Sequence, residues 1–173
     1  AYLLPAIFSN KRVVISTATK NLQEQLFFKD VPFLEKALNR TLSVCYMKGR
    51  SNYLCWKKLE EIEGEAYLFS PHDPEYLRMI KMWAQNTATG DRAELTELPD
   101  DIMLWHRLDA RRETCSGQKC RNFDSCFVTR IRQKALASDI IIVNHHLFFA
   151  DLALRQGDFA SVLPDYSTAV FDE

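Results

Sequence analysis

The stretch KRVVISTATKNLQEQL (residues 11–26) joins a strand pattern directly to a helix pattern. Residues 11–17 begin with two basic side chains, continue through β-branched residues and end in hydroxyls, which is typical of a buried strand in a parallel sheet. Apolar residues then recur at helical spacing to about Leu38. We expect a break before Pro32, because the residue preceding a proline disfavours the α conformation.

The same order returns near the other end of the chain. SDIIIVNHH (138–146) is a run of aliphatic residues that ends in polar ones, and a helix pattern over 147–154 follows it. After a turn around Gly157, TAVFDE (168–173) is again strand-like, and LSVCYM (42–47) is a further short strand candidate. Strand–helix–strand spacing at both ends predicts an α/β fold with a parallel sheet.

The composition is that of an ordinary globular domain. The chain has 173 residues, of which 47% are hydrophobic and 26% charged, which excludes a disordered tail, a collagen-like chain and a coiled coil. No apolar run reaches the ~18 residues that a membrane span needs, so we expect no membrane association and a cytoplasmic location. The apolar ends, AYLLPAIF (1–8) and TAVFDE, carry no signal-peptide pattern, and we interpret them as cuts through a larger protein.

Strand patterns are missing from the middle of the chain. A helix is predicted to open with Asp73 as its N-cap and Pro74 as its first residue. A short helix is predicted to surround Trp105, and a basic amphipathic helix to cover residues 127–137. We therefore expect residues 1–52 and 139–173 to build the sheet, and residues 53–138 to form a mostly helical insertion.

The insertion carries a cluster of cysteines. Five cysteines without a secretory signal argue against a disulfide framework. Cys115, Cys120 and Cys126 form a C-x4-C-x5-C run, and Cys55 lies in the turn-rich segment KGRSNYLC at the start of the insertion. Zinc sites usually use pairs of closely spaced cysteines, whereas these longer gaps with one remote ligand suit a [4Fe–4S] cluster better. Cys45 lies in an apolar strand, where a cysteine is usually an inert buried residue.

Charge is distributed unevenly along the chain. The net charge is −1, from 22 basic and 23 acidic residues, yet residues 107–134 hold eight basic and three acidic side chains, a local net charge of +5. Some of these cations would balance an anionic metal–thiolate cluster. The surplus could face a phosphate backbone, with Tyr53, Trp56 or Phe123 available to stack on bases. The two interpretations are compatible.

Polar residues that follow the predicted strands are weak signals when taken singly. Thr17 and Thr19 could bind an anion at a helix start, but such residues are more often plain helix caps. Asp172 and Glu173 stand where a nucleotide-binding α/β fold places carboxylates for magnesium and water, although two acids at a strand end are otherwise simply solvated.

In combination, these features resemble the first motor domain of the iron–sulfur superfamily 2 DNA helicases, the XPD/DinG-like family, and the bacterial DinG-like members most closely. The resemblance implies a RecA-like sheet interrupted by an iron–sulfur insertion, and it covers essentially the whole chain. The matching segments are ISTATKNLQEQL, KGRSNYLC, the run of three cysteines, IIIVNHHLFFADL and VFDE.

The resemblance assigns roles to individual residues. It implies that Cys55, Cys115, Cys120 and Cys126 ligate a [4Fe–4S] cluster. It also implies that Asp172 assists a Mg²⁺ site and that Glu173 activates the attacking water for ATP hydrolysis. His145 and His146 match an Asn-His segment of the family and are interpreted as structural or interface residues. The expected DNA-binding residues are Thr17, Thr19, Arg50, Arg112, Lys119 and Arg121.

The resemblance predicts that the parent protein is a monomeric ATP-dependent helicase that unwinds DNA with 5′-to-3′ polarity. Its partners would be ATP, single-stranded DNA and the DNA fork. The chain contains no G-x-x-x-x-G-K-[ST] phosphate loop, and its acidic box stops after Asp172-Glu173. We therefore expect the chain on its own to lack ATP hydrolysis. The insertion would act as a stiff wedge near the separating strands.

Two other interpretations remain open at the level of sequence. The chain could be a non-catalytic zinc or iron–sulfur module that binds nucleic acid or senses redox state. It could also be an α/β domain whose cysteines are incidental. Metal analysis separates the three, because they predict iron with sulfide, one zinc ion, and no metal.

Overall fold

The computed structural model describes residues 2–62, 70–157 and 161–172 and divides into two compact units. The sheet unit comprises residues 1–48 and 131–173, and the inserted unit comprises residues 49–130. The second boundary between them falls inside one helix, α7 (Phe127–Leu136).

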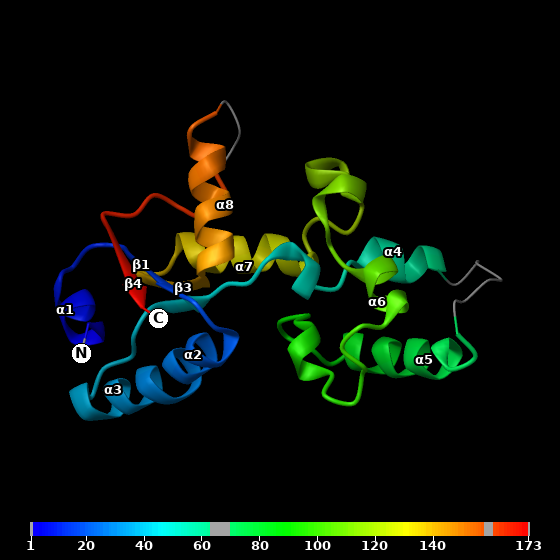
Figure 1. The fold of residues 1–173 in the computed structure, drawn as a ribbon, viewed down its shortest axis with the longest axis horizontal. Coiled ribbons are helices and arrows are strands. Elements are labelled where there is room, and N and C mark those ends of the chain that lie inside the picture. The colour runs from blue at the N-terminus through cyan, green and yellow to red at the C-terminus, as the bar shows by residue number, and fades with distance from the viewer. Residues whose placement is uncertain (1, 63–69, 158–160, 173) are drawn as a thin grey trace. The chain divides into compact units, whose positions relative to one another are not determined.

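The sheet unit contains four parallel strands in the order β2-β3-β1-β4 (Figure 1). Their bounds are Val13–Thr17 for β1, Val44–Tyr46 for β2, Ile140–Asn144 for β3 and Thr168–Asp172 for β4. The two central strands, β1 and β3, are almost entirely buried, as their aliphatic sequences require. The α/β class and the parallel sheet predicted from sequence are confirmed.

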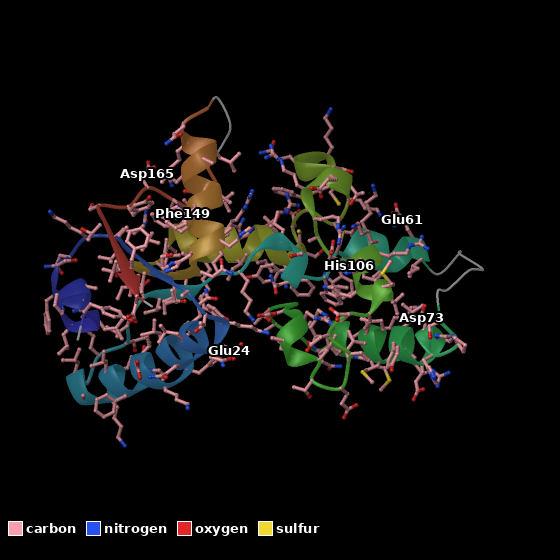
Figure 2. The ribbon with its side chains drawn as sticks, viewed as in Figure 1. Glu24, Glu61, Asp73, His106, Phe149 and Asp165 are labelled. Atoms are coloured by element: carbon pink, nitrogen blue, oxygen red, sulfur yellow. The ribbon has the colours of Figure 1, made fainter. Side chains whose placement is uncertain are left out.

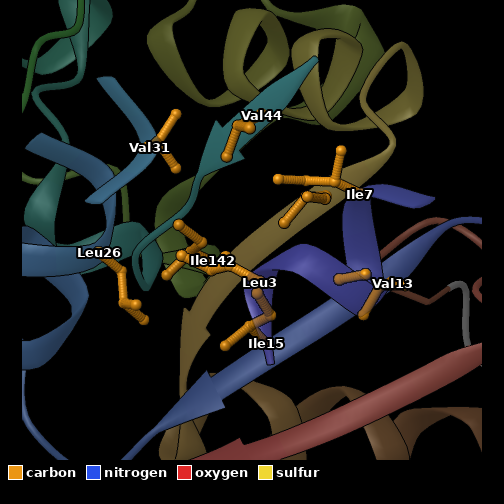
Figure 3. Packing of buried hydrophobic residues seen from close by; sticks show 10 residues of the cluster. Leu3, Ile7, Val13, Ile15, Leu26, Val31, Val44 and Ile142 are labelled. Atoms are coloured by element: carbon orange, nitrogen blue, oxygen red, sulfur yellow. The ribbon is translucent and has the colours of Figure 1, made fainter. Parts of the chain in front are cut away.

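Helices cover both faces of this sheet. On one face lie α1 (Leu3–Phe8), α2 (Lys20–Gln25) and α3 (Val31–Leu38), and on the other lie the second part of α7 and α8 (His145–Arg155). Alternate residues of each strand point to opposite faces, so the core has two halves. Figure 3 shows the first half, in which Leu3, Ile7, Leu26 and Val31 pack on Ile15 and Ile142. The second half is built around Val14, Ile141, Leu147 and Phe148.

The helical segment after β1 differs from the sequence expectation. We expected a break before Pro32, but the chain remains helical and changes to π-type hydrogen bonding over Leu26–Asp30 before α3 begins. Pro32 stands in the first turn of α3, where the absence of its N–H costs little. The wider turn thus accommodates the proline without ending the helix.

The inserted unit is mostly helical. Its helices are α4 (Trp56–Glu61), α5 (Asp73–Ala84), α6 (Met103–Leu108) and the first part of α7. Short 3₁₀ turns connect them at Arg50–Asn52, Arg92–Glu94, Arg112–Thr114 and Gly117–Lys119. Among its described residues, β-structure is limited to two isolated bridges, Tyr53 with Asp91 and Leu54 with Asp109. Its buried residues include Leu54, Ile80, Leu104, Leu108 and Phe127.

Asp73 has a different role at the start of α5 from the one its sequence context suggests. It is the first residue of the helix rather than the cap, and its buried carboxylate accepts a hydrogen bond from the Ser70 backbone N–H at 2.9 Å. The side chain thereby closes the turn that leads into the helix. None of the described helices combines the length and the apolar character needed to cross a membrane.

Candidate functional site

The carboxyl ends of three neighbouring strands meet at one edge of the sheet. In the strand register, Thr17 at the end of β1 pairs with Asn144 of β3 on one side and with Asp172 of β4 on the other. The Ala18 N–H extends the ladder by donating to the Asp172 carbonyl oxygen at 3.1 Å. This edge is where open α/β sheets bind their ligands.

The two threonines after β1 are held differently. Thr17 is fully buried and its hydroxyl donates to the Thr19 carbonyl at 3.1 Å. Thr19 is exposed, and its side-chain oxygen accepts from the Leu22 N–H at 3.2 Å, which makes it the N-cap of α2. Thr17 therefore shapes the turn from within, while Thr19 faces solvent beside the sheet edge.

Asp172 is half-buried and has a partner that sequence analysis did not identify. The Tyr2 hydroxyl, from the residue that precedes α1, donates a hydrogen bond to Asp172 Oδ2. Burial raises the pKa of Tyr2 well above its ordinary value, and the hydrogen bond and negative charge of Asp172 raise it further. Tyr2 and Asp172 are 170 positions apart, so local sequence offered no signal for the pair. Glu173 lies outside the described residues.

Helix α8 starts at the same edge. The Asn144 side chain caps it by accepting from the Leu147 N–H at 2.8 Å. His145 Nδ1 lies 2.7 Å from the hydroxyl oxygen of the buried Ser16, and its ring contacts Phe171 with centroids 5.8 Å apart. His145 thus has polar and aromatic contacts within the sheet unit, whereas His146 is exposed.

In the inserted unit, Cys55 occupies the N-cap position of α4. Its backbone N–H donates to the Leu108 carbonyl at 2.8 Å, which holds it beside the end of α6. Burial raises the pKa of its thiol, and the nearby Cys126 thiol adds to the rise, against the lowering effect of Lys58 and the amides at the start of α4. The Cys126 thiol therefore lies close enough to Cys55 to act on it electrostatically.

The other three cysteines of the set each close a tight turn. The N–H of Cys115 donates to Arg112 O at 3.1 Å, that of Cys120 to Gly117 O at 3.0 Å, and that of Cys126 to Phe123 O at 3.3 Å. Cys115 is exposed and the other two are half-exposed. Residues 112–119 are all exposed, so the loops that carry these cysteines have little core of their own.

Side chains tie these loops to α4, the helix that begins directly after Cys55. Lys57 Nζ donates to Ser116 Oγ at 3.3 Å, and Glu60 binds Arg121 Nη2 at 2.5 Å and Asn122 Nδ2 at 3.0 Å. Trp56 stacks on Phe127, the neighbour of Cys126, with ring centroids 5.6 Å apart. The segments that carry the four cysteines thus converge around one helix.

The donor set suits a thiophilic centre, because thiolates are the usual ligands of both zinc and iron–sulfur clusters. Among the described residues, however, no three His, Cys, Asp or Glu side chains are arranged to hold a metal ion. Cys45 is separate from the set: it is buried in β2, its thiol donates to the Ile131 carbonyl at 3.8 Å, and burial raises its pKa to about 11.

The basic residues expected to bind DNA occupy the turns of the inserted unit. Arg50 begins a 3₁₀ turn and is half-buried. Arg112 and Lys119 are exposed on two other 3₁₀ turns. Arg121 is exposed and is paired with Glu60.

Sequence analysis missed Asp109, which is fully buried and paired with Arg111, because it resembles any other loop aspartate.

Comparison with known proteins places these features in context. Over its whole length the chain is 40% identical to "ATP-dependent DNA helicase YoaA" of Haemophilus influenzae and 36% identical to the protein of the same name in Escherichia coli. Over 99% of its length it is 31% identical to "3'-5' exonuclease DinG" of Bacillus subtilis. The chain spans 27%, 27% and 18% of these relatives. No family model matches the chain. The resemblance to a segment of the DinG-like proteins is thereby confirmed.

Proposed function

We propose that this chain is a segment of the first, RecA-like motor domain of an ATP-dependent DNA helicase of the DinG-like family. The observation that carries the proposal is similarity along the whole chain to two proteins named as ATP-dependent DNA helicases. The parallel sheet supports it, because its carboxyl edge brings Thr17 and Asp172 side by side, and this is the edge where open α/β sheets bind nucleotides.

The sheet edge would supply the nucleotide chemistry of the complete protein. Asp172 would help to hold the Mg²⁺ that accompanies ATP. When bound, this ion neutralises charge on the transferred phosphoryl group. Tyr2 would keep the Asp172 carboxylate in place through its hydrogen bond. Glu173 would orient and activate the attacking water. The exposed Thr19 would contact a DNA strand, with the buried Thr17 fixing the turn beneath it.

The inserted unit would be the iron–sulfur domain, with Cys55, Cys115, Cys120 and Cys126 as ligands of a [4Fe–4S] cluster. Three observations support this: four cysteines of one unit whose segments converge on α4, turns that present three of them, and loops with little core of their own. A cluster would crosslink the loops at four points, and this gives them the stiffness that their side chains do not supply.

We further propose that the insertion contacts DNA during 5′-to-3′ unwinding. Arg50, Arg112, Lys119 and Arg121 would neutralise phosphates of the strand, which is a sequence-independent and salt-sensitive contribution to binding. The exposure of Arg112, Lys119 and Arg121 on the turns of the inserted unit supports this role.

A strand-displacement assay on the complete protein tests the proposal. We expect ATP-dependent release of an intact strand from a duplex with a 5′ single-stranded tail, and little release from a 3′-tailed duplex. Because Glu173 would activate the water, Glu173→Gln should lower ATP turnover about 100-fold or more. The length of the released strand separates unwinding from nuclease digestion. Shortened strands, or turnover that survives Glu173→Gln, would refute the helicase proposal.

A further inference from the structure

The inserted unit contains a cleft whose lining residues flank Cys55 and Cys115 in sequence but include none of the four cysteines. It lies between α4, α6 and the turn at Arg112–Thr114 and has a volume of ≈450 Å³. Figure 2 shows two of its residues, Glu61 on α4 and His106 on α6. The remaining polar side chains that line it are Lys57, Lys58, Arg107, Arg111 and Thr114. The volume is within the range of small-molecule sites.

A fully buried carboxylate organises the cations of this cleft. Asp109 accepts two hydrogen bonds from the Arg111 guanidinium, from Nε at 2.8 Å and from Nη2 at 2.6 Å. Lys58 Nζ lies 3.7 Å from the same carboxylate, and Arg111 Nη2 also lies 2.9 Å from His106 Nδ1. Because these contacts hold the cationic side chains in place, a ligand would pay little conformational entropy to engage them.

Positive charge exceeds negative charge around the cleft. Four cationic side chains, Lys57, Lys58, Arg107 and Arg111, line the cleft with one carboxylate, Glu61. Two further carboxylates act on Arg111 from beside the cleft, the buried Asp109 and Glu113. Glu61 lies 3.8 Å from Lys57 and offsets that cation. The cations exceed these carboxylates by one, four against three, and this excess favours an anionic occupant.

We propose that this cleft binds a phosphate-bearing ligand, with the Arg107 and Arg111 guanidinium groups and Lys58 holding the phosphate oxygens. Arginine matches the geometry of phosphate and donates paired hydrogen bonds to it, and the Thr114 hydroxyl adds a neutral donor. The cleft has room for more than one phosphate group. The phosphates could come from a free polyphosphate or from a single-stranded DNA backbone, and binding of a free polyphosphate does not depend on the helicase proposal.

Titration calorimetry of the full chain with inorganic pyrophosphate tests the cleft directly. We expect a dissociation constant of about 1 mM or tighter. Arg107→Gln and Arg111→Gln should each weaken binding about tenfold or more, because each removes a charge-assisted hydrogen bond. Arg111→Gln also removes the main partner of Asp109, whereas Arg107→Gln leaves that pair intact. Arg78→Gln, an equal charge change at an exposed position of α5 outside the cleft, should bind as the unchanged chain does.

Competition with a short oligothymidylate distinguishes the two sources of phosphate. If pyrophosphate displaces the oligonucleotide and Arg107→Gln weakens both, the cleft holds the DNA backbone. If pyrophosphate binds without displacing DNA, the cleft serves a free polyphosphate. Pyrophosphate binding that is absent at millimolar concentration, or that is equally strong in the Arg107→Gln, Arg111→Gln and Arg78→Gln variants, would overturn the proposal.

Discussion

Gly90 occupies a position in the inserted unit that a side chain could not share. Its backbone φ is +65°, and a Cβ built there would lie 2.3 Å from two ring atoms of Phe127. Its carbonyl accepts from the Leu54 N–H at 3.0 Å, so the backbone cannot move away without breaking that contact. Because Phe127 also stacks on Trp56, Gly90 lies at the packing centre that joins α4 to α7.

Replacing Gly90 by alanine should therefore destabilise the inserted unit strongly. Gly117 is the matched control, because its φ is +57° but a Cβ there would meet nothing within 4 Å. We expect Gly90→Ala to lower the free energy of unfolding by at least about 3 kcal/mol, from strain plus overpacking, and Gly117→Ala by about 1 kcal/mol, from strain alone. All three tryptophans, Trp56, Trp83 and Trp105, lie in this unit, so urea denaturation followed by tryptophan fluorescence measures it. Equal losses in the two variants would contradict the packing role of Phe127.

The position of a single residue in the fold was predictable where the residues next to it in sequence formed a strand or helix pattern. Thr17 and Asp172 end apolar runs, and the register places them next to each other. The Tyr2–Asp172 bond and the Asp109–Arg111 pair had no such signal. The first joins residues at opposite ends of the chain, and the second depends on the burial of Asp109, which its neighbours in sequence do not indicate.

At the scale of elements, α8 fixes the segment that leads into β4. Asp151, on the inner side of α8, is fully buried and accepts from the Leu163 N–H at 2.8 Å and from Arg155 Nε at 2.6 Å. Its Oδ1 also accepts from the Val162 N–H at 2.5 Å. This one carboxylate satisfies two backbone donors of the segment that precedes the strand of Asp172.

Asp151→Asn should loosen that segment. Because the change removes a charge from a buried ion pair and replaces an acceptor by a donor, we expect a loss of about 3 kcal/mol in the sheet unit. Asp165→Asn is the control, since Asp165 is fully exposed and contacts the same Arg155 at 3.1 Å. Because solvent screens an exposed ion pair, this change should leave the stability almost unaltered. Hydrogen exchange of the β3 and β4 amides reports the difference. Faster exchange in both variants, or in neither, would show that Asp151 does not anchor the segment.

Elements were predicted more reliably than their ends. The aliphatic runs before Thr17 and Asn144 form buried parallel strands, as their patterns indicated. The strand predicted over 42–47 is shorter, Val44–Tyr46, because pairing with β3 and not composition decides where it ends. The π turn at Leu26–Asp30 could not be predicted, because a proline pattern does not tell a broken helix from a widened one.

On the scale of the whole molecule, the chain interrupts one α/β unit with another compact unit. The structural boundaries fall at residues 48/49 and 130/131, whereas the sequence suggested 52/53 and 138/139. The second difference arises because Ile131 and Ala135 of α7 pack on the sheet although the helix begins in the inserted unit. The basic amphipathic pattern of that helix is continuous, so the sequence could not predict the position along the helix at which the inserted unit ends.

The central claim is that Cys55, Cys115, Cys120 and Cys126 bind one iron–sulfur cluster in a helicase segment. Its most direct test is the iron and acid-labile sulfide content of the chain purified without oxygen, alone and with Cys120→Ser or Cys45→Ser. Cys45→Ser is the matched control, because Cys45 is a free thiol buried in the sheet unit. We predict about four iron and four sulfide per chain, lost in Cys120→Ser and kept in Cys45→Ser. One zinc per chain without sulfide, or equal loss in both variants, would contradict the claim.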